Sequence, residues 1–138
     1  MNINNQNLKV YFEDERNLLT AIWNTSEDML DADYQSLIRK YCDYLDVYQP
    51  ANILIDVNNS KFAIAVDMQE WVKQTISPYY KKYQTKKIAI VISDDFIAQL
   101  SYEQITREFE SKELHIEFFA DVDTATTWLI SGKKPKKF

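Results

Sequence analysis

Glycine is almost missing from this chain, since Gly132 is the one glycine among 138 residues. Walker-A and Rossmann GxGxxG loops need several glycines, because their backbone must approach a phosphate closely. The sequence therefore excludes both loop types. Cys42 is likewise the one cysteine, so this chain can form no intramolecular disulfide, no multi-cysteine zinc site and no CxxC redox pair.

Basic residues and long apolar runs are also scarce. The chain has 16 Lys and Arg against 21 Asp and Glu, with a formal net charge of −5, so it lacks the basic excess that supplies most nucleic-acid affinity. The longest apolar stretches, such as residues 88–92, span about five residues, whereas a membrane helix needs roughly 20. No signal sequence is visible at the start. We expect a cytoplasmic protein with no nucleic-acid partner and no membrane span.

The composition indicates a single folded domain. Hydrophobic residues make up 46% of the chain and charged residues 27%, proportions that are typical of globular proteins. A chain of this length can bury a core without disulfides or metals. We expect one domain over residues 1–132, followed by a flexible tail over residues 133–138 that is rich in lysine.

The first part of the chain predicts a β-hairpin and a helix. Residues 9–13 and 18–24 are β-rich runs that a polar stretch separates, which is typical of a hairpin. Apolar residues then recur at three- and four-residue steps over residues 31–48, the period of an amphipathic helix. Pro50 should end this helix.

Three later apolar runs predict strands that are buried on both faces. They lie at residues 52–57, 87–92 and 114–119. A helix follows each run. The first of these helices should start near Val66, and we expect Pro78 to kink or interrupt it.

The next helix should start after an N-cap within residues 93–95 and end near Ser111. We expect its inward face to consist of Phe96, Ile97, Leu100 and Ile105. Asp121 should cap a last short helix that ends at Gly132. The order ββαβαβαβα predicts an α/β fold with a mixed, mainly parallel five-stranded sheet, flanking helices and right-handed crossovers.

Several local strings resemble a known family. They are ILIDV at residues 53–57, KIAIV at residues 87–91, and EFFAD to ATTWL within residues 117–129. Over residues 8–130 the chain resembles the SpoIIAA-like domains, which include the anti-sigma-factor antagonists (STAS domains) and share their outline with the CRAL-TRIO lipid carriers.

The resemblance implies a non-catalytic binding or regulatory module that acts through protein–protein contacts. In the antagonist branch a serine at a helix N-terminus is phosphorylated, whereas Met68 occupies that position here. Ser60, earlier in the same loop, is the candidate substitute. The alternative that the CRAL-TRIO likeness implies is a small-molecule or lipid carrier, with a hydrophobic ligand in a cleft between the second and third helices.

Polar residues follow two of the predicted parallel strands, at the sheet edge where ligands bind in open α/β folds. These side chains could meet a ligand or partner, or they could cap helices and close loops. The candidate rim residues are Asp56, Asn58, Asn59, Ser60, Ser93 and Asp94.

No catalytic pattern is visible, because the chain has neither a GxSxG nor an HExxH motif. His115, the one histidine, should share a strand face with Glu117. Cys42 falls within an amphipathic helix and should pack there. We therefore expect a non-enzymatic protein with no metal and no cofactor.

Tyrosine is abundant, with nine residues in the chain. Its apolar ring and polar tip suit interfaces and ligand clefts as well as the edge of a core. We expect a homodimer or a complex with another protein. The candidate interface residues are Tyr34, Tyr44, Tyr79, Tyr80 and Tyr83.

Overall fold

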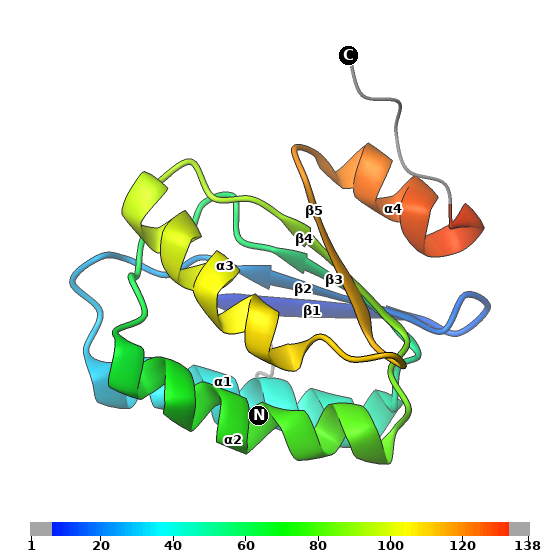
Figure 1. The fold of residues 1–138 in the computed structure, drawn as a ribbon, viewed down its shortest axis with the longest axis horizontal. Helices are drawn as coiled ribbons and strands as arrows, with labels where there is room; N and C mark the ends of the chain where they lie inside the picture. The colour runs from blue at the N-terminus through cyan, green and yellow to red at the C-terminus, as the bar shows by residue number, and fades with distance from the viewer. Residues whose placement is uncertain (1–6, 133–138) are drawn as a thin grey trace.

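The computed structural model describes residues 7–132, so the expected lysine-rich tail at 133–138 lies outside the described residues. The strands are β1 (Leu8–Glu13), β2 (Leu18–Trp23), β3 (Asn52–Asp56), β4 (Lys87–Val91) and β5 (His115–Phe119). The helices are α1 (Asp31–Tyr48), α2 (Val66–Lys82), α3 (Phe96–Phe109) and α4 (Val122–Ser131) (Figure 1). This confirms the predicted element order.

The five strands form one mixed sheet in the order β1-β2-β3-β4-β5. β1 and β2 pair antiparallel as a hairpin, and the remaining neighbours pair parallel. The register sets Ile53 beside Ile88, and Ile88 beside Ile116. The predicted mixed, mainly parallel sheet is confirmed.

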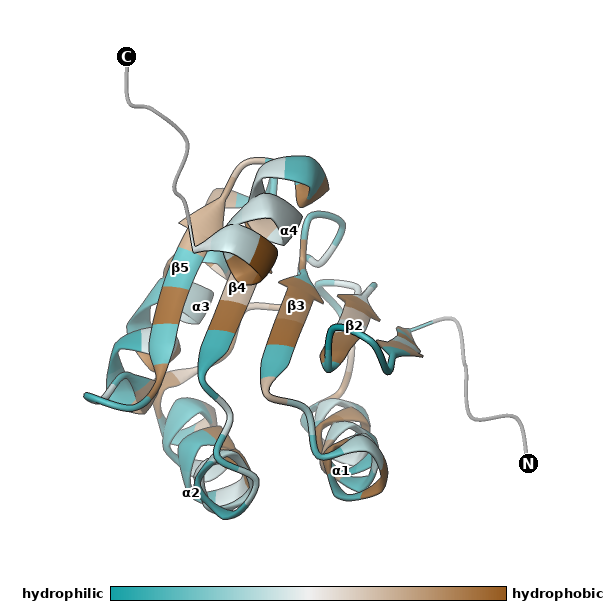
Figure 2. Ribbon diagram, turned by 90° about the vertical axis from the view of Figure 1, so that its right-hand side faces the viewer, coloured by the Kyte–Doolittle hydropathy of each residue, from teal (hydrophilic) through white to brown (hydrophobic). Residues whose placement is uncertain are grey.

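The sequential strand order decides where the helices lie. Each crossover from β2 to β5 moves one strand further in the same direction, and crossovers of parallel strands are right-handed. The three crossover helices α1, α2 and α3 must therefore cover the same face of the sheet, as Figure 2 shows. α4 follows the last strand and lies against β3, β4 and β5 on the opposite face.

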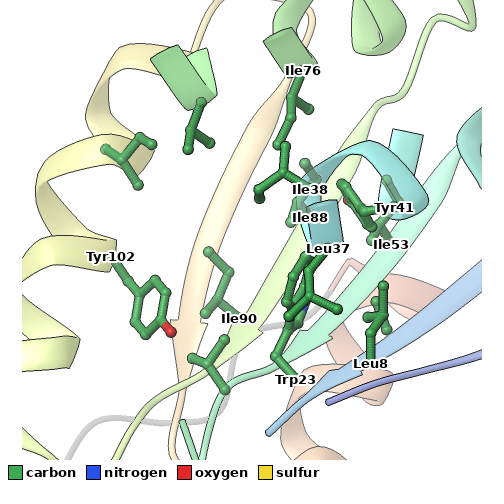
Figure 3. Packing of buried hydrophobic residues seen from close by; sticks show 14 of the residues in the cluster. Leu8, Trp23, Leu37, Ile38, Tyr41, Ile53, Ile76, Ile88, Ile90 and Tyr102 are labelled. Carbon is green, nitrogen blue, oxygen red and sulfur yellow. The ribbon is translucent and has the colours of Figure 1, made fainter. Parts of the chain in front are cut away.

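The main core fills the space between the sheet and the three crossover helices. Figure 3 shows Trp23, Ile88 and Ile90 of the sheet beneath side chains of the helices. A second, smaller cluster lies under α4, where Trp128 packs on Phe119 with ring centroids 5.5 Å apart. The side of β1 that faces away from the main core is open, and Tyr11 is 56% exposed there.

The orientation of α3 differs from the prediction. Phe96 and Ile97 are 75% and 61% exposed, and Leu100 is 42% exposed. The prediction that these residues face the core is wrong. The buried face of α3 consists of Ile105, as expected, together with Ala98, Ser101, Tyr102 and Thr106. Ser101 and Thr106 can be buried because their hydroxyls donate to the carbonyls of Ala98 and Tyr102 within the helix.

Pro78 does not interrupt α2, which continues to Lys82. A proline inside a helix has no N–H to donate and so leaves one carbonyl, here that of Gln74, without its helical partner. Pro78 and Gln74 are both exposed, so water can hydrate that carbonyl. Of the two expected effects, the interruption is wrong, because the proline lies on the solvent side of the helix; the kink stays a prediction.

The scarcity of glycine is visible at the turns. Asn17, Gln49 and Gln84 have φ angles of 49°, 48° and 54°, in the left-handed region that glycine normally occupies. Gly132 also has a positive φ, of 75°, and its N–H donates to the carbonyl of Trp128 at the end of α4. This is an ordinary glycine C-cap.

Replacing Trp128 should remove the main apolar contact between α4 and the sheet. Trp128 is 5% exposed, packs on Phe119, and has the Lys87 ammonium 5.5 Å from its ring centre. We expect Trp128→Ala to lower the free energy of unfolding by about 3–5 kcal/mol in urea titrations. The matched control is Ile130→Ala on the same helix, 51% exposed, which should change it by less than about 0.5 kcal/mol. Equal effects of the two variants would contradict this packing.

The cap of α4 should make stability depend on pH. Asp121 accepts a hydrogen bond from the Thr124 N–H at 2.8 Å, and this contact and the Thr124 hydroxyl hold the pKa of Asp121 below its ordinary value near 3.8. Its contribution is therefore complete above the unfolded-state pKa and is lost as pH falls through the lower folded-state pKa. We expect Asp121→Ala to lower Tm at pH 7 and to lower it less at pH 2. The control Ile130→Ala, at an exposed position of the same helix, removes no titrating group and should change Tm equally little at both pH values.

Candidate functional site

The structure brings most of the predicted rim residues together at the carboxyl ends of β3 and β4. The Asn58 N–H donates to Asp56 Oδ1 at 3.0 Å, and the Asp94 N–H donates to the Asn58 carbonyl at 3.2 Å. In the orientation that satisfies its hydrogen bonds, the Asn58 amide also donates to Asp94 Oδ1 at 3.2 Å. Asn59 is exposed. The two loops are thus tied to each other.

Ser60 and Ser93 lie beneath this rim, with 0% and 4% exposure. The Ser60 hydroxyl donates to the Trp23 carbonyl at 2.9 Å, and the Ser93 hydroxyl donates to the Ser60 carbonyl at 2.6 Å. A modifying enzyme cannot reach a hydroxyl that is fully buried in the folded chain. Ser60 therefore lacks the accessibility that a phosphorylated serine needs.

The strand order gives this rim no topological switch point, the place where open α/β sheets form a ligand crevice. Such crevices form where the strand order reverses and neighbouring helices separate to opposite faces. The order from β2 to β5 has no reversal. Asp95 adds a cap, since its Oδ1 accepts from the Ala98 N–H at 2.9 Å. The rim side chains thus close loops and cap α3.

The candidate interface tyrosines fall into two groups. Tyr34, Tyr44 and Tyr80 are 4%, 8% and 7% exposed, so the expectation that they present a surface is wrong for these three side chains. Tyr34 packs on Trp23 and Phe62, and Tyr44 stacks on Tyr48. Tyr80 is enclosed by Tyr41 of α1 and Phe109 of α3. Tyr79 and Tyr83 are half-buried, and the Tyr83 hydroxyl donates to Asp46 Oδ1.

Four tyrosines line a cavity of about 80 Å³ inside the main core. Tyr34 and Tyr41 come from α1, Tyr80 from α2 and Tyr102 from α3, and the remaining wall is mostly isoleucine. The hydroxyls of Tyr41 and Tyr80 are 2.8 Å apart and share one hydrogen bond. Burial is the largest cause that raises the pKa of all four tyrosines, so their phenols stay protonated at neutral pH.

Buried hydroxyl groups lie beside Tyr102, one of the residues that line this tyrosine cavity. Burial raises the pKa of Tyr102, and the neighbouring Ser60 and Thr25 hydroxyls oppose that rise. Thr25 is 1% exposed, and its Oγ1 makes no hydrogen bond of good geometry with any described residue. The Tyr34 ring stacks on Phe62 at 4.4 Å between centroids. The core thus holds hydroxyl groups that are not fully paired.

A wide groove of about 1090 Å³ lies outside the core, between the C-terminal halves of α2 and α3. Tyr80 and Phe109 line both this groove and the tyrosine cavity. Their rings meet edge to face, with centroids 5.5 Å apart and planes at 72°. His115 is exposed and lies at the edge of the groove, away from the rim.

The sequence reasoning missed an exposed apolar patch at the start of α2 and α3. We define the α3 patch as Val66, Phe96, Ile97 and Leu100, which are 78%, 75%, 61% and 42% exposed. α2 and α3 run parallel, with Gln69 bonded to Gln104 and Lys73 paired with Glu108, each at 2.9 Å. The same offset of 35 residues sets Val66 level with Ser101, the sequence neighbour of Leu100. The sequence feature that could have revealed this patch is a second apolar stripe on α3, formed by Phe96, Ile97 and Leu100.

Other reactive side chains are distant from these features or are buried. Burial and the nearby carboxylates of Asp43 and Asp46 raise the pKa of the Cys42 thiol to about 12, so it is protonated at neutral pH. Within residues 7–132, no three His, Cys, Asp or Glu side chains are grouped to hold a metal ion. No helix in that range is long and apolar enough to cross a membrane.

No protein-family model, curated protein or solved structure matches this chain.

The buried hydroxyl beneath the rim should be structural. Ser60→Ala removes the donor to the Trp23 carbonyl and the acceptor that lies 3.4 Å from the Thr25 N–H. Both backbone groups then lose a buried partner, and we expect the free energy of unfolding to fall by about 1–3 kcal/mol. Asn59→Ala, the exposed neighbour, serves as the control and should be nearly neutral in the same urea titration. A neutral Ser60→Ala would contradict the structural role.

Proposed function

We propose that the protein is a non-catalytic interaction module of the SpoIIAA-like type that pairs with a second copy of itself through α3. The observation that carries this proposal is the α3 patch, four large apolar side chains that water surrounds in the single chain. Contiguous exposed apolar surface commonly marks a protein contact. The element order ββαβαβαβα and the local strings that resemble the family support the assignment of type.

The exposed stripe of α3 suits an antiparallel pair of helices. Phe96, Leu100, Glu103 and Arg107 recur at steps of four, three and four residues, the spacing of a helix–helix seam. A two-fold axis between Leu100 and Glu103 would set Phe96 of one copy against Arg107 of the other. A guanidinium over an aromatic ring is a favourable contact.

The charges at the two ends of this stripe support the same arrangement. Asp94 precedes the stripe and Arg107 ends it, and both side chains are exposed. In an antiparallel pair the acidic end of one helix meets the basic end of the other. A self-complementary patch is what a two-fold dimer requires, and two-fold dimers are the commonest assembly of soluble proteins.

The rim contributes by fixing the start of α3. The Ser93 hydroxyl accepts from the Asp95 N–H at 3.1 Å, and Asp95 caps the helix. The Ser101 hydroxyl accepts from the Ile64 N–H at 3.1 Å and so ties α3 to the segment before α2. These bonds hold the patch in one orientation, which lowers the entropy cost of pairing.

Sedimentation equilibrium tests this proposal. We expect the wild-type chain to sediment as a dimer at tens of micromolar, and Leu100→Asp to shift it to monomer, because the new carboxylate would face Glu103 of the other copy across the two-fold axis. The matched control is Val47→Asp on α1, where the valine is 69% exposed; this variant should remain a dimer.

Two outcomes would reject the proposal. One is a wild-type chain that stays monomeric up to about a hundred micromolar. The other is a dimer that Leu100→Asp leaves intact, which would assign the contact to a different surface. Circular dichroism of each variant checks that the helices are retained.

A further inference from the structure

We propose that the tyrosine cavity is a binding site for a compact, uncharged molecule with one acceptor oxygen, such as a small ketone. This site is separate from the α3 patch and does not depend on dimer formation. It lies between the sheet and the helices α1, α2 and α3, whereas the patch lies on the outer side of α3.

The case for an acceptor on the ligand rests on Tyr34. This side chain is 4% exposed and lines the cavity. Its hydroxyl makes no hydrogen bond with another described residue, although the hydroxyls of Tyr80 and Tyr102 are near enough to help raise its pKa. Because this hydroxyl lines the cavity and has no protein partner, its hydrogen bond depends on whatever occupies the cavity, whereas phenylalanine would fill the same space without that dependence. A ligand oxygen in the cavity would satisfy the donor.

The walls define the rest of the ligand. Isoleucines from three strands and from the three crossover helices surround the cavity, among them Ile55, Ile88, Ile105 and Ile116. No lysine, arginine, aspartate or glutamate lines it, so an ionised ligand would lose its hydration without a counter-charge. The molecule bound there must therefore be neutral and mainly apolar.

The volume limits the size of the ligand. About 80 Å³ equals the liquid volume of two to three water molecules and is roughly half that of an engineered core cavity that takes benzene. A molecule of about three or four non-hydrogen atoms fits this space. A cavity of this volume is too small for the acyl chain of a lipid.

The access route is the wall that the cavity shares with the outer groove. Phe109 is the last residue of α3, where helices fray most readily. Rotation of its ring away from Tyr80 would connect the cavity with the groove. The hydrogen bond between Tyr41 and Tyr80 holds the Tyr80 side of this wall in place.

Two small probes and one substitution test the site by NMR of the full chain. Xenon reports the apolar volume, and acetone reports the volume together with the acceptor. We expect both to shift the methyl signals of Ile38, Ile76 and Ile105 in the wild type. Tyr34→Phe should leave xenon binding unchanged and weaken acetone binding about threefold to tenfold, the effect of one lost hydrogen bond. The control Tyr11→Phe, at an exposed tyrosine on the opposite face, should change neither probe.

Two further measurements distinguish a ligand site from a merely structural tyrosine. Ile105→Phe fills the cavity and should abolish the binding of both probes. The Tm of ligand-free Tyr34→Phe should equal or exceed that of the wild type, because an unpaired buried hydroxyl is removed. A lower Tm would overturn the proposal, as would an absence of acetone shifts in the wild type or an unchanged acetone affinity in Tyr34→Phe.

Discussion

The right-handed connection between parallel strands is the constraint on which this structure depends. Because β2 to β5 follow one another in sequence order, the rule places α1, α2 and α3 on a single face. That face acquires a thick core with room for five buried tyrosines, whereas the other face has only α4. The same order removes the strand reversal at which open α/β folds commonly bind ligands.

Buried serine hydroxyls hold the loops together at the carboxyl ends of the strands. Ser60, Ser93 and Ser101 each bond to backbone groups of a different loop or helix. With so little glycine, the loops cannot approach one another through bare backbone, and short side chains bridge them instead. These hydrogen bonds link the start of α3 to the ends of β2 and β3. The exterior patch and the interior cavity therefore share one rigid support.

Much of the fold could be predicted from the sequence, since periodic apolar positions and Pro50 set α1 at residues 31–48, as observed. The faces of α3 could not be predicted, because two apolar stripes compete and the buried one contains Ser101 and Thr106. Tyrosine was ambiguous for a related reason. Its ring favours burial and its hydroxyl favours water, so the position of Tyr34 depended on the neighbouring helix and not on its own pattern. The rim residues were found, but their mutual bonding needed three-dimensional contacts.

The unequal cover of the two faces divides the molecule into regions of different local stability. α4 is joined to the sheet by a cluster of eight buried residues, whereas the opposite core contains most of the others. Segments with few buried contacts open before the whole domain unfolds. Amide hydrogens of α4 are therefore expected to exchange through a partial opening in which the hairpin and the three crossover helices stay folded. In that state Ala89 and Val91 would be exposed to solvent, whereas Ile88 and Ile90 would stay buried in the main core.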